Sequence, residues 1–132
     1  MSTSKKEKLD KTKNAKNQLP ELLLKIAGLC EDNKAKNIVV LDLSNIHSYL
    51  SYFLIVTSLS SLHLKKVSSE VIHLLKENNV FMKVLPKEQD YESGWVILDE
   101  GEFIIHIFTE ETRQHYNLEA LWSKALSIKL KE

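Results

Sequence analysis

Cysteine, glycine and proline are scarce in this chain, and their scarcity excludes several kinds of site. The single cysteine, Cys30, rules out an intramolecular disulfide and a cysteine-rich zinc site. The three glycines, Gly28, Gly94 and Gly101, are too far apart to form a glycine-rich phosphate loop. No apolar run approaches the roughly 18–20 residues that span a bilayer. We therefore expect no disulfide, no membrane association and no nucleotide-binding loop.

Catalytic motifs are also missing. No two histidines have the helical spacing of a metal motif, and the serines lack an elbow motif with a positioned acid–base partner. His106, which lies in an apolar segment, is more typical of a hydrogen-bonded packing residue than of a catalytic base. We expect no catalytic residue, no metal site and no cofactor, and we interpret the chain as a non-enzyme. The histidines are His47, His63, His73, His106 and His115.

Positive and negative charges cancel over the whole chain but are unevenly distributed. Residues 1–18 contain six lysines and two acidic residues, which gives 6 − 2 = +4, so residues 19–132 sum to −4. The first stretch has almost no apolar side chains and lacks the apolar centre of a secretory signal. We expect residues 1–18 to be a disordered basic leader, either solvated or touching nucleic acid, and 19–132 to be one domain of a soluble cytoplasmic protein.

Helical periodicity and capping signals predict the helices. Pro20 suits the first turn of a helix that continues to about residue 35 with Cys30 on its buried stripe. Ser60 or Ser61 can cap a second helix that ends near Glu77. We expect one or two short closing helices over 113–125, and we interpret 86–93 as a charged loop and 45–51 as a polar connector.

Short runs of branched apolar residues predict strands at 37–43, 52–57 and 80–85, and a hairpin over 94–109 adds two more. The order strand, helix, strand over 52–85 predicts a parallel pair with a right-handed crossover. The expected fold class is therefore α/β, with a mixed five-stranded sheet and flanking helices.

The hairpin has two contrasting faces. A two-residue turn at Glu100 and Gly101 would place Asp99 opposite Glu102, Ile97 opposite Ile104 and Trp95 opposite His106. Alternation then gives one wholly apolar core face and one mixed face. The core face carries Val96, Leu98, Phe103, Ile105 and Ile107, and the mixed face carries Trp95, Ile97, Asp99, Glu102, Ile104, His106 and Phe108.

The region of this hairpin has no Lys or Arg between Lys87 and Arg113, whereas it contains eight acidic residues and several aromatic ones. Such a surface suits a basic protein partner and is poorly suited to phosphate. Trp95 and Phe108 are either exposed at this interface or covered by a terminal helix. The predicted partner-binding residues are Tyr91, Trp95, Ile97, Asp99, Glu100, Glu102, His106 and Phe108.

Four segments together resemble the ribosomal silencing factor S, or Iojap, family. They are VVLDL at 39–43, YFLIVTS at 52–58 with SSLHLKKV at 60–67, GWVILDEGEFIIHIF at 94–108, and RQHYNLEALW at 113–122. The chain departs from the family at Ser51, where an Asp is usual, and at Ser58, where a Gly is usual.

This resemblance implies an outline similar to nucleotidyltransferases, without established transferase activity. It also implies binding to the large ribosomal subunit through ribosomal protein fourteen, a steric block to subunit joining, and repression of translation when nutrients are scarce. Family members are often homodimers when free. Lys65 and Lys66 add a possible minor contact with ribosomal RNA.

Two alternatives follow from the residues. A small nucleotidyltransferase would need paired carboxylates on a strand to hold two metal ions, and Asp42 has Ser44 where a second acid would help. A homodimeric scaffold would use the hairpin face for self-pairing. Replacing Asp99 and Glu102 with lysine separates this scaffold from a ribosome-binding protein, because self-association would survive while ribosome binding would be lost.

Overall fold

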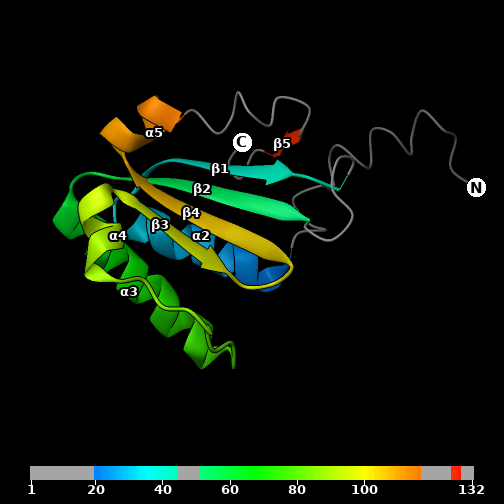
Figure 1. Ribbon diagram of the computed structural model, residues 1–132. Helices are drawn as coiled ribbons and strands as arrows, with labels where there is room; N and C mark the ends of the chain where they lie inside the picture. The colour runs from blue at the N-terminus through cyan, green and yellow to red at the C-terminus, as the bar shows by residue number, and fades with distance from the viewer. Residues whose placement is uncertain (1–19, 45–50, 117–125, 129–132) are drawn as a thin grey trace, which may run out of the picture.

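A mixed β-sheet forms the centre of the computed structural model, which describes residues 20–44, 51–116 and 126–128 (Figure 1). The order of the strands is β3-β4-β2-β1-β5. Strands β2 and β4 are parallel, and the pairs β1–β2, β3–β4 and β1–β5 are antiparallel. The strands are β1 (Lys36–Asp42), β2 (Tyr52–Ser58), β3 (Trp95–Asp99), β4 (Phe103–Thr109) and the short β5 (Leu126–Ile128).

Helices α2 (Glu21–Asp32) and α3 (Ser61–Glu77) cover one face of this sheet. Their apolar stripes and the strand residues that face them form the larger buried cluster, here called the inner cluster, which includes Cys30, Val96 and Leu98. Burial raises the pKa of the Cys30 thiol to about 12, as expected for an inert core cysteine. Two short helices, α4 (Glu88–Ser93) and α5 (Glu110–Tyr116), flank the hairpin.

The signals that predicted the helices and the hairpin are confirmed. Pro20 immediately precedes α2. The Ser60 side chain accepts a hydrogen bond from the backbone N–H of His63 and so caps α3. The five predicted core residues of the hairpin are all buried at 0–1% exposure. The closing segment begins earlier than expected, at Glu110, and the rest of it after Tyr116 lies outside the described residues, as do the predicted leader and most of the 45–51 connector.

The strand predicted at 80–85 was wrong. This segment forms no strand and lies in the connection between α3 and α4, with Phe81, Val84 and Leu85 exposed. The parallel partner of β2 is therefore β4 rather than 80–85, and the short β5 adds an edge to the sheet that the sequence did not indicate. The predicted charged loop at 86–93 was also wrong in part, because Glu88–Ser93 is the helix α4.

The hairpin register differs from the prediction by two residues. The structure pairs Trp95 with Phe108, Ile97 with His106 and Asp99 with Ile104. The reason is that Gly101 occupies the first rather than the second turn position, with φ +116°, and the Glu100 N–H donates to the Phe103 carbonyl. A shift of two preserves the side-chain alternation, so the predicted faces are right while the predicted partners are not.

Candidate functional site

The sheet face opposite α2 and α3 carries a cluster of rings, here called the aromatic cluster: Phe53, Trp95, His106, Phe108 and Tyr116. The Trp95 ring centroid lies 4.9 Å from that of Phe108 and 4.8 Å from that of Tyr116. The Phe53 ring meets His106 edge-on at 4.5 Å. Phe108 and His106 are buried, Trp95 is half-buried and Tyr116 is exposed. Trp95 and Tyr116 thus present aromatic surface on a rigid base.

A hydrogen bond orients the two polar rings of this cluster. The Trp95 Nε1–H donates to His106 Nδ1 at 3.2 Å. Burial lowers the pKa of His106 to about 4, because the charged imidazolium would be desolvated. His106 is therefore neutral at physiological pH and supports Trp95 as a packing residue, in line with the sequence-based interpretation.

Two other residues hold the cluster in place. Gly94 ends α4 with φ +82°, and a Cβ atom there would approach the Thr112 hydroxyl oxygen to 2.5 Å, so only glycine fits before Trp95. The buried Arg113 side chain on α5 donates to the Asn37 carbonyl and to the Thr57 hydroxyl. Arg113 therefore ties α5, and with it Tyr116, to strands β1 and β2.

Acidic residues form the turn at the far end of the hairpin. Asp99 Oδ1 accepts from the Gly101 N–H at 2.9 Å, and Glu100 Oε2 lies 3.4 Å from the Glu102 N–H. Partial burial, together with the neighbouring Glu102 and Asp99 carboxylates, raises the pKa of Glu100 despite these turn hydrogen bonds. The opposition of Asp99 and Glu102 expected from the sequence does not occur, and both side chains are exposed beside Ile97.

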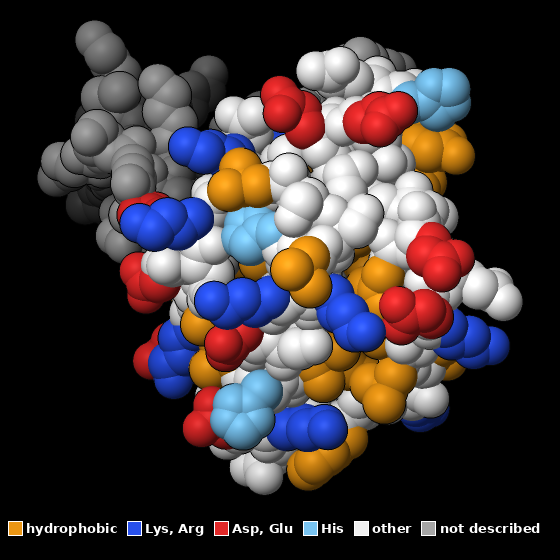
Figure 2. All heavy atoms as spheres, turned by 90° about the vertical axis from the view of Figure 1, so that its left-hand side faces the viewer, with side chains coloured by type: hydrophobic (Ala, Val, Ile, Leu, Met, Phe, Trp, Pro, Cys, Tyr) orange, Lys and Arg blue, Asp and Glu red, His pale blue; other side chains and the backbone are white. Residues whose placement is uncertain are grey.

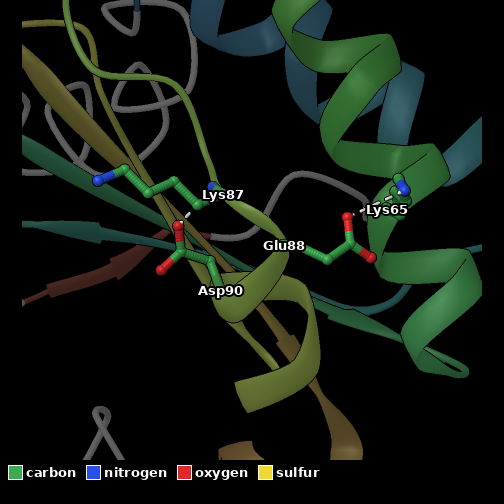
Figure 3. A network of polar contacts seen from close by, with 4 residues as sticks. All are labelled: Lys65, Lys87, Glu88 and Asp90. Carbon is green, nitrogen blue, oxygen red and sulfur yellow. Dashed lines mark hydrogen bonds and ion pairs between the residues drawn. The ribbon is translucent and has the colours of Figure 1, made fainter.

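Tyr91 is the one predicted site residue that lies elsewhere, packed against the inner cluster rather than the aromatic cluster. Its ring lies under the Lys65 Nζ, 5.5 Å from the ring centroid. Lys65 also pairs with Glu88 at 3.2 Å, and Asp90 accepts from the Lys87 backbone N–H at 2.7 Å (Figure 3). The two Lys65 contacts join α4 to α3, and they engage one of the two lysines predicted to touch RNA.

The end of the molecule at which α3, α4 and α5 gather has no single charge sign (Figure 2). Both basic and acidic side chains surround a patch of hydrophobic groups on this face. A pocket between α3 and residues 85–91 is lined by Ile72, Leu85 and Tyr91, with His73 and Lys76 beside them. The sheet's hairpin end, by contrast, carries the acidic residues Asp99, Glu100 and Glu102 without a basic residue on either strand.

Sequence reasoning missed some surface residues. Tyr116 was not among the predicted site residues, yet its ring packs on Trp95 while the residue is 48% exposed. Phe81, Val84 and Leu85 were assigned to a strand and are exposed. Arg113 and Tyr116 lie three residues apart and so share one side of a helix. This spacing was the signal available in the sequence for the position of Tyr116. Residues 117–125 of the same closing segment lie outside the described part of the chain.

Within the described residues, no three His, Cys, Asp or Glu side chains are grouped in a way that could hold a metal ion. Asp42, the carboxylate considered for metal chemistry, accepts hydrogen bonds from the backbone N–H and hydroxyl of Ser44. No helix in the same described ranges is long and apolar enough to cross a membrane.

Comparison with known proteins identifies relatives over most of the chain. Residues 16–132 match the family described as "Ribosomal silencing factor during starvation". Ribosomal silencing factor RsfS of Bacillus subtilis is 35% identical over 104 residues, which cover 78% of this chain and 86% of that protein. An Iojap-related mitochondrial protein of Arabidopsis thaliana is 32% identical, over 80% of this chain and 56% of that protein.

A solved structure supports the same relationship. The crystal structure of a Bacillus halodurans protein matches with a TM-score of 0.69 at 28% identity, covering 84% of this chain and 100% of that one. The family match includes every strand and helix described above, together with the glycine–tryptophan hairpin and the arginine–tyrosine helix. The chain therefore belongs to the ribosomal silencing factor, or Iojap, family.

Proposed function

We propose that this protein binds the large ribosomal subunit through ribosomal protein fourteen and blocks joining of the small subunit, which represses translation when nutrients are scarce. The observation that carries this proposal is the surface made by Trp95, Tyr116, Ile97 and the acidic turn, in a member of a silencing-factor family. The proposed site of action is the cytoplasm, where the subunits meet.

Charge supports a basic protein partner. The segment 88–112 contains no Lys or Arg, and Asp99 and Glu102 are exposed at its centre. Proteins that bind ribosomal RNA are typically basic, so complementary charge would speed their encounter with this surface. The affinity would come mainly from burial of apolar groups, for which Trp95 and Ile97 are the available anchors.

The predicted site residues divide into two roles within this proposal. Ile97, Asp99, Glu100, Glu102 and the accessible part of Trp95 contact the partner. His106 and Phe108 are buried and hold the Trp95 ring from beneath. Tyr91 lies on the helical side of the sheet and contributes through the packing of α4 against α3.

Steric exclusion is sufficient for inhibition. A 15.2 kDa body on the face where two subunits meet would prevent their contact without any chemical step. The proposal therefore contains no transferase reaction, even though an outline like that of nucleotidyltransferases is part of the expected fold. Asp42 accepts hydrogen bonds from Ser44 and has no second carboxylate beside it on β1.

Sedimentation with purified ribosomal subunits tests the proposal. Wild-type protein is expected to pellet with large subunits and to reduce formation of complete ribosomes in a light-scattering assay. The double variant Asp99→Lys with Glu102→Lys is expected to lose at least about tenfold in affinity, because two attractive charges become repulsive. Normal subunit joining at saturating wild-type protein would contradict the proposal.

A matched control separates the local surface from net charge. Glu70→Lys with Glu77→Lys makes the same change in charge on α3, which lies across the sheet from the aromatic cluster. This control is expected to bind large subunits within about threefold of wild type. Equal losses in both double variants would show that only overall charge matters.

Two further parts of the proposal concern other contacts. The free protein forms a homodimer, and Asp99→Lys with Glu102→Lys leaves that dimer intact. Sedimentation equilibrium of both proteins measures this directly. A minor contact of Lys66 with ribosomal RNA is tested by Lys66→Ala. Loss of one phosphate contact would reduce the slope of log affinity against log salt concentration by about one.

A further inference from the structure

Strand β3 is an edge of the sheet with a free backbone side (Figure 1). Its neighbour β4 bonds to alternate residues, because the Gly94 carbonyl accepts from the Thr109 N–H and the Glu100 N–H donates to Phe103. The alternation places Val96 and Leu98 in bonded pairs with β4. The N–H and C=O groups of Trp95, Ile97 and Asp99 therefore point outward, and no described residue bonds to them.

An apolar groove lies beside this free edge. It has a volume of about 650 Å³ and runs between β3 and the connection over 80–86. Apolar side chains along it are unusually exposed: Phe81 is 69%, Val84 76% and Ile97 51% exposed. Edge strands in monomeric proteins are commonly protected by lysine, proline or a covering element, and β3 has neither residue type. An exposed apolar groove on an open edge is the arrangement used in strand addition.

The charges along the groove specify the chemistry of the occupant. Asp90, Asp99 and Glu100 line it, and Lys83 is the basic residue in the lining, so the sum is −2. A segment with lysine or arginine would be attracted, and one with acidic residues would be repelled. Alternation of apolar and basic residues would place one set of side chains on the groove and the other toward the carboxylates.

We propose that an extended basic–apolar segment of a partner protein pairs with the outer edge of β3 and becomes an additional strand of the sheet. Backbone hydrogen bonds to Ile97 and Asp99 hold it, and Phe81 and Val84 pack against its apolar side chains. The side chains of Ile97, Asp99 and Glu100 at this groove also belong to the surface proposed above to contact the ribosome, but the pairing itself uses the backbone edge of β3 and is tested on the isolated protein.

The test uses a blocked heptapeptide that alternates valine and lysine, with a matched peptide that alternates valine and glutamate. Hydrogen exchange followed by NMR is expected to slow about tenfold at the Ile97 and Asp99 amides when the lysine peptide saturates. The Val96 and Leu98 amides, already bonded to β4, are expected to change little. The glutamate peptide is expected to bind at least about tenfold more weakly.

A pair of variants isolates the backbone contribution. Ile97→Pro removes an outward N–H without removing a bond to β4, a position at which edge strands accept proline. It is expected to weaken the lysine peptide about tenfold, whereas Ile97→Val, which keeps the N–H, is expected to bind like wild type. Val84→Ser removes an apolar side chain from the groove wall without changing β3, so it tests the contribution of that wall to peptide binding.

Several outcomes would overturn the inference. One is no binding of the lysine peptide at millimolar concentration, and another is binding that leaves the Ile97 and Asp99 amides unprotected. Equal affinity for the two peptides would exclude charge recognition. Protection of the same amides that rises with protein concentration, without peptide, would assign the edge to a second copy of this chain. Failure of large-subunit sedimentation would bear on the proposed function alone.

Discussion

The indole N–H of Trp95 donates to Nδ1 of His106, and this bond decides which nitrogen of the neutral imidazole carries the proton. Because Nδ1 is the acceptor, the proton lies on Nε2, which has no hydrogen-bond partner among the described residues. Protonation of the ring would place a second N–H opposite the indole N–H. The bond is therefore compatible with neutral His106 and incompatible with the imidazolium.

The first prediction is a loss of stability in acid that originates at His106. Its pKa falls from 6.5 to about 4 on folding, so the unfolded chain binds the proton more strongly. The contribution of neutral His106 to the free energy of unfolding is fully present above pH 6.5 and is lost as the pH falls toward 4. Between pH 7 and pH 5 the free energy of unfolding should drop by about 2 kcal/mol from this group. Urea unfolding at a series of pH values measures it.

His106→Gln provides the comparison for this prediction. Glutamine can accept the indole N–H and does not titrate, so its stability should be nearly flat over the same pH range. His115→Gln, at an exposed position on α5, should retain the wild-type pH dependence. Parallel stability curves for wild type and His106→Gln would assign the acid sensitivity to other groups.

The second prediction concerns Arg113, whose buried guanidinium connects α5 to the Asn37 carbonyl and the Thr57 hydroxyl. Arg113→Ala should lower the free energy of unfolding by about 3 kcal/mol, because it leaves the buried Thr57 hydroxyl and the part-buried Asn37 carbonyl without this donor. Gln114→Ala, at the exposed neighbouring position, should change stability by less than about 0.5 kcal/mol. Chemical denaturation of both variants tests this, and equal small effects would remove Arg113 as the anchor of α5.

The third prediction contrasts two glycines that both have space for a methyl group. Gly101→Ala should destabilise the protein by about 1–3 kcal/mol, because φ is +116° at the turn. Gly28→Ala, in the interior of α2 with no positive φ, should stabilise it by about 0.5–1 kcal/mol. Thermal melting of the two variants should shift in opposite directions. A shift in the same direction would contradict the turn geometry.

Local patterns were sufficient to predict much of this fold. The helical stripe through Ile26 and Cys30, the Ser60 cap and the alternation along 94–109 depend on neighbours close in sequence, and the structure confirms all three. Segment 80–85 is likewise a short apolar run, interrupted only by Lys83, but it pairs with no strand in the described part of the chain. Pairing is a nonlocal property, so its apolar residues could not reveal that Phe81 and Val84 are exposed.

The hairpin register shows a subtler limit. A two-residue turn accepts glycine at either central position, so the Glu100–Gly101–Glu102 sequence fits two registers. The two registers have identical faces, which is why the core was predicted correctly and the Asp99 partner was not. For the candidate site, the acidic turn and Trp95 were visible in the sequence. The contact of Tyr116 with Trp95 was not, because it depends on how Arg113 anchors α5.

The fourth prediction separates the two roles of Trp95. Trp95→Ala should cost about 2 kcal/mol of stability, since the ring is only half-buried, and should weaken large-subunit binding at least about tenfold while thermal melting stays cooperative. Trp95→Phe keeps a ring against Phe108 and Tyr116 but leaves His106 Nδ1 without its donor. It should lose about 1 kcal/mol of stability and retain most binding. Noncooperative melting of Trp95→Ala would instead make Trp95 a core residue, and its binding loss would then report unfolding.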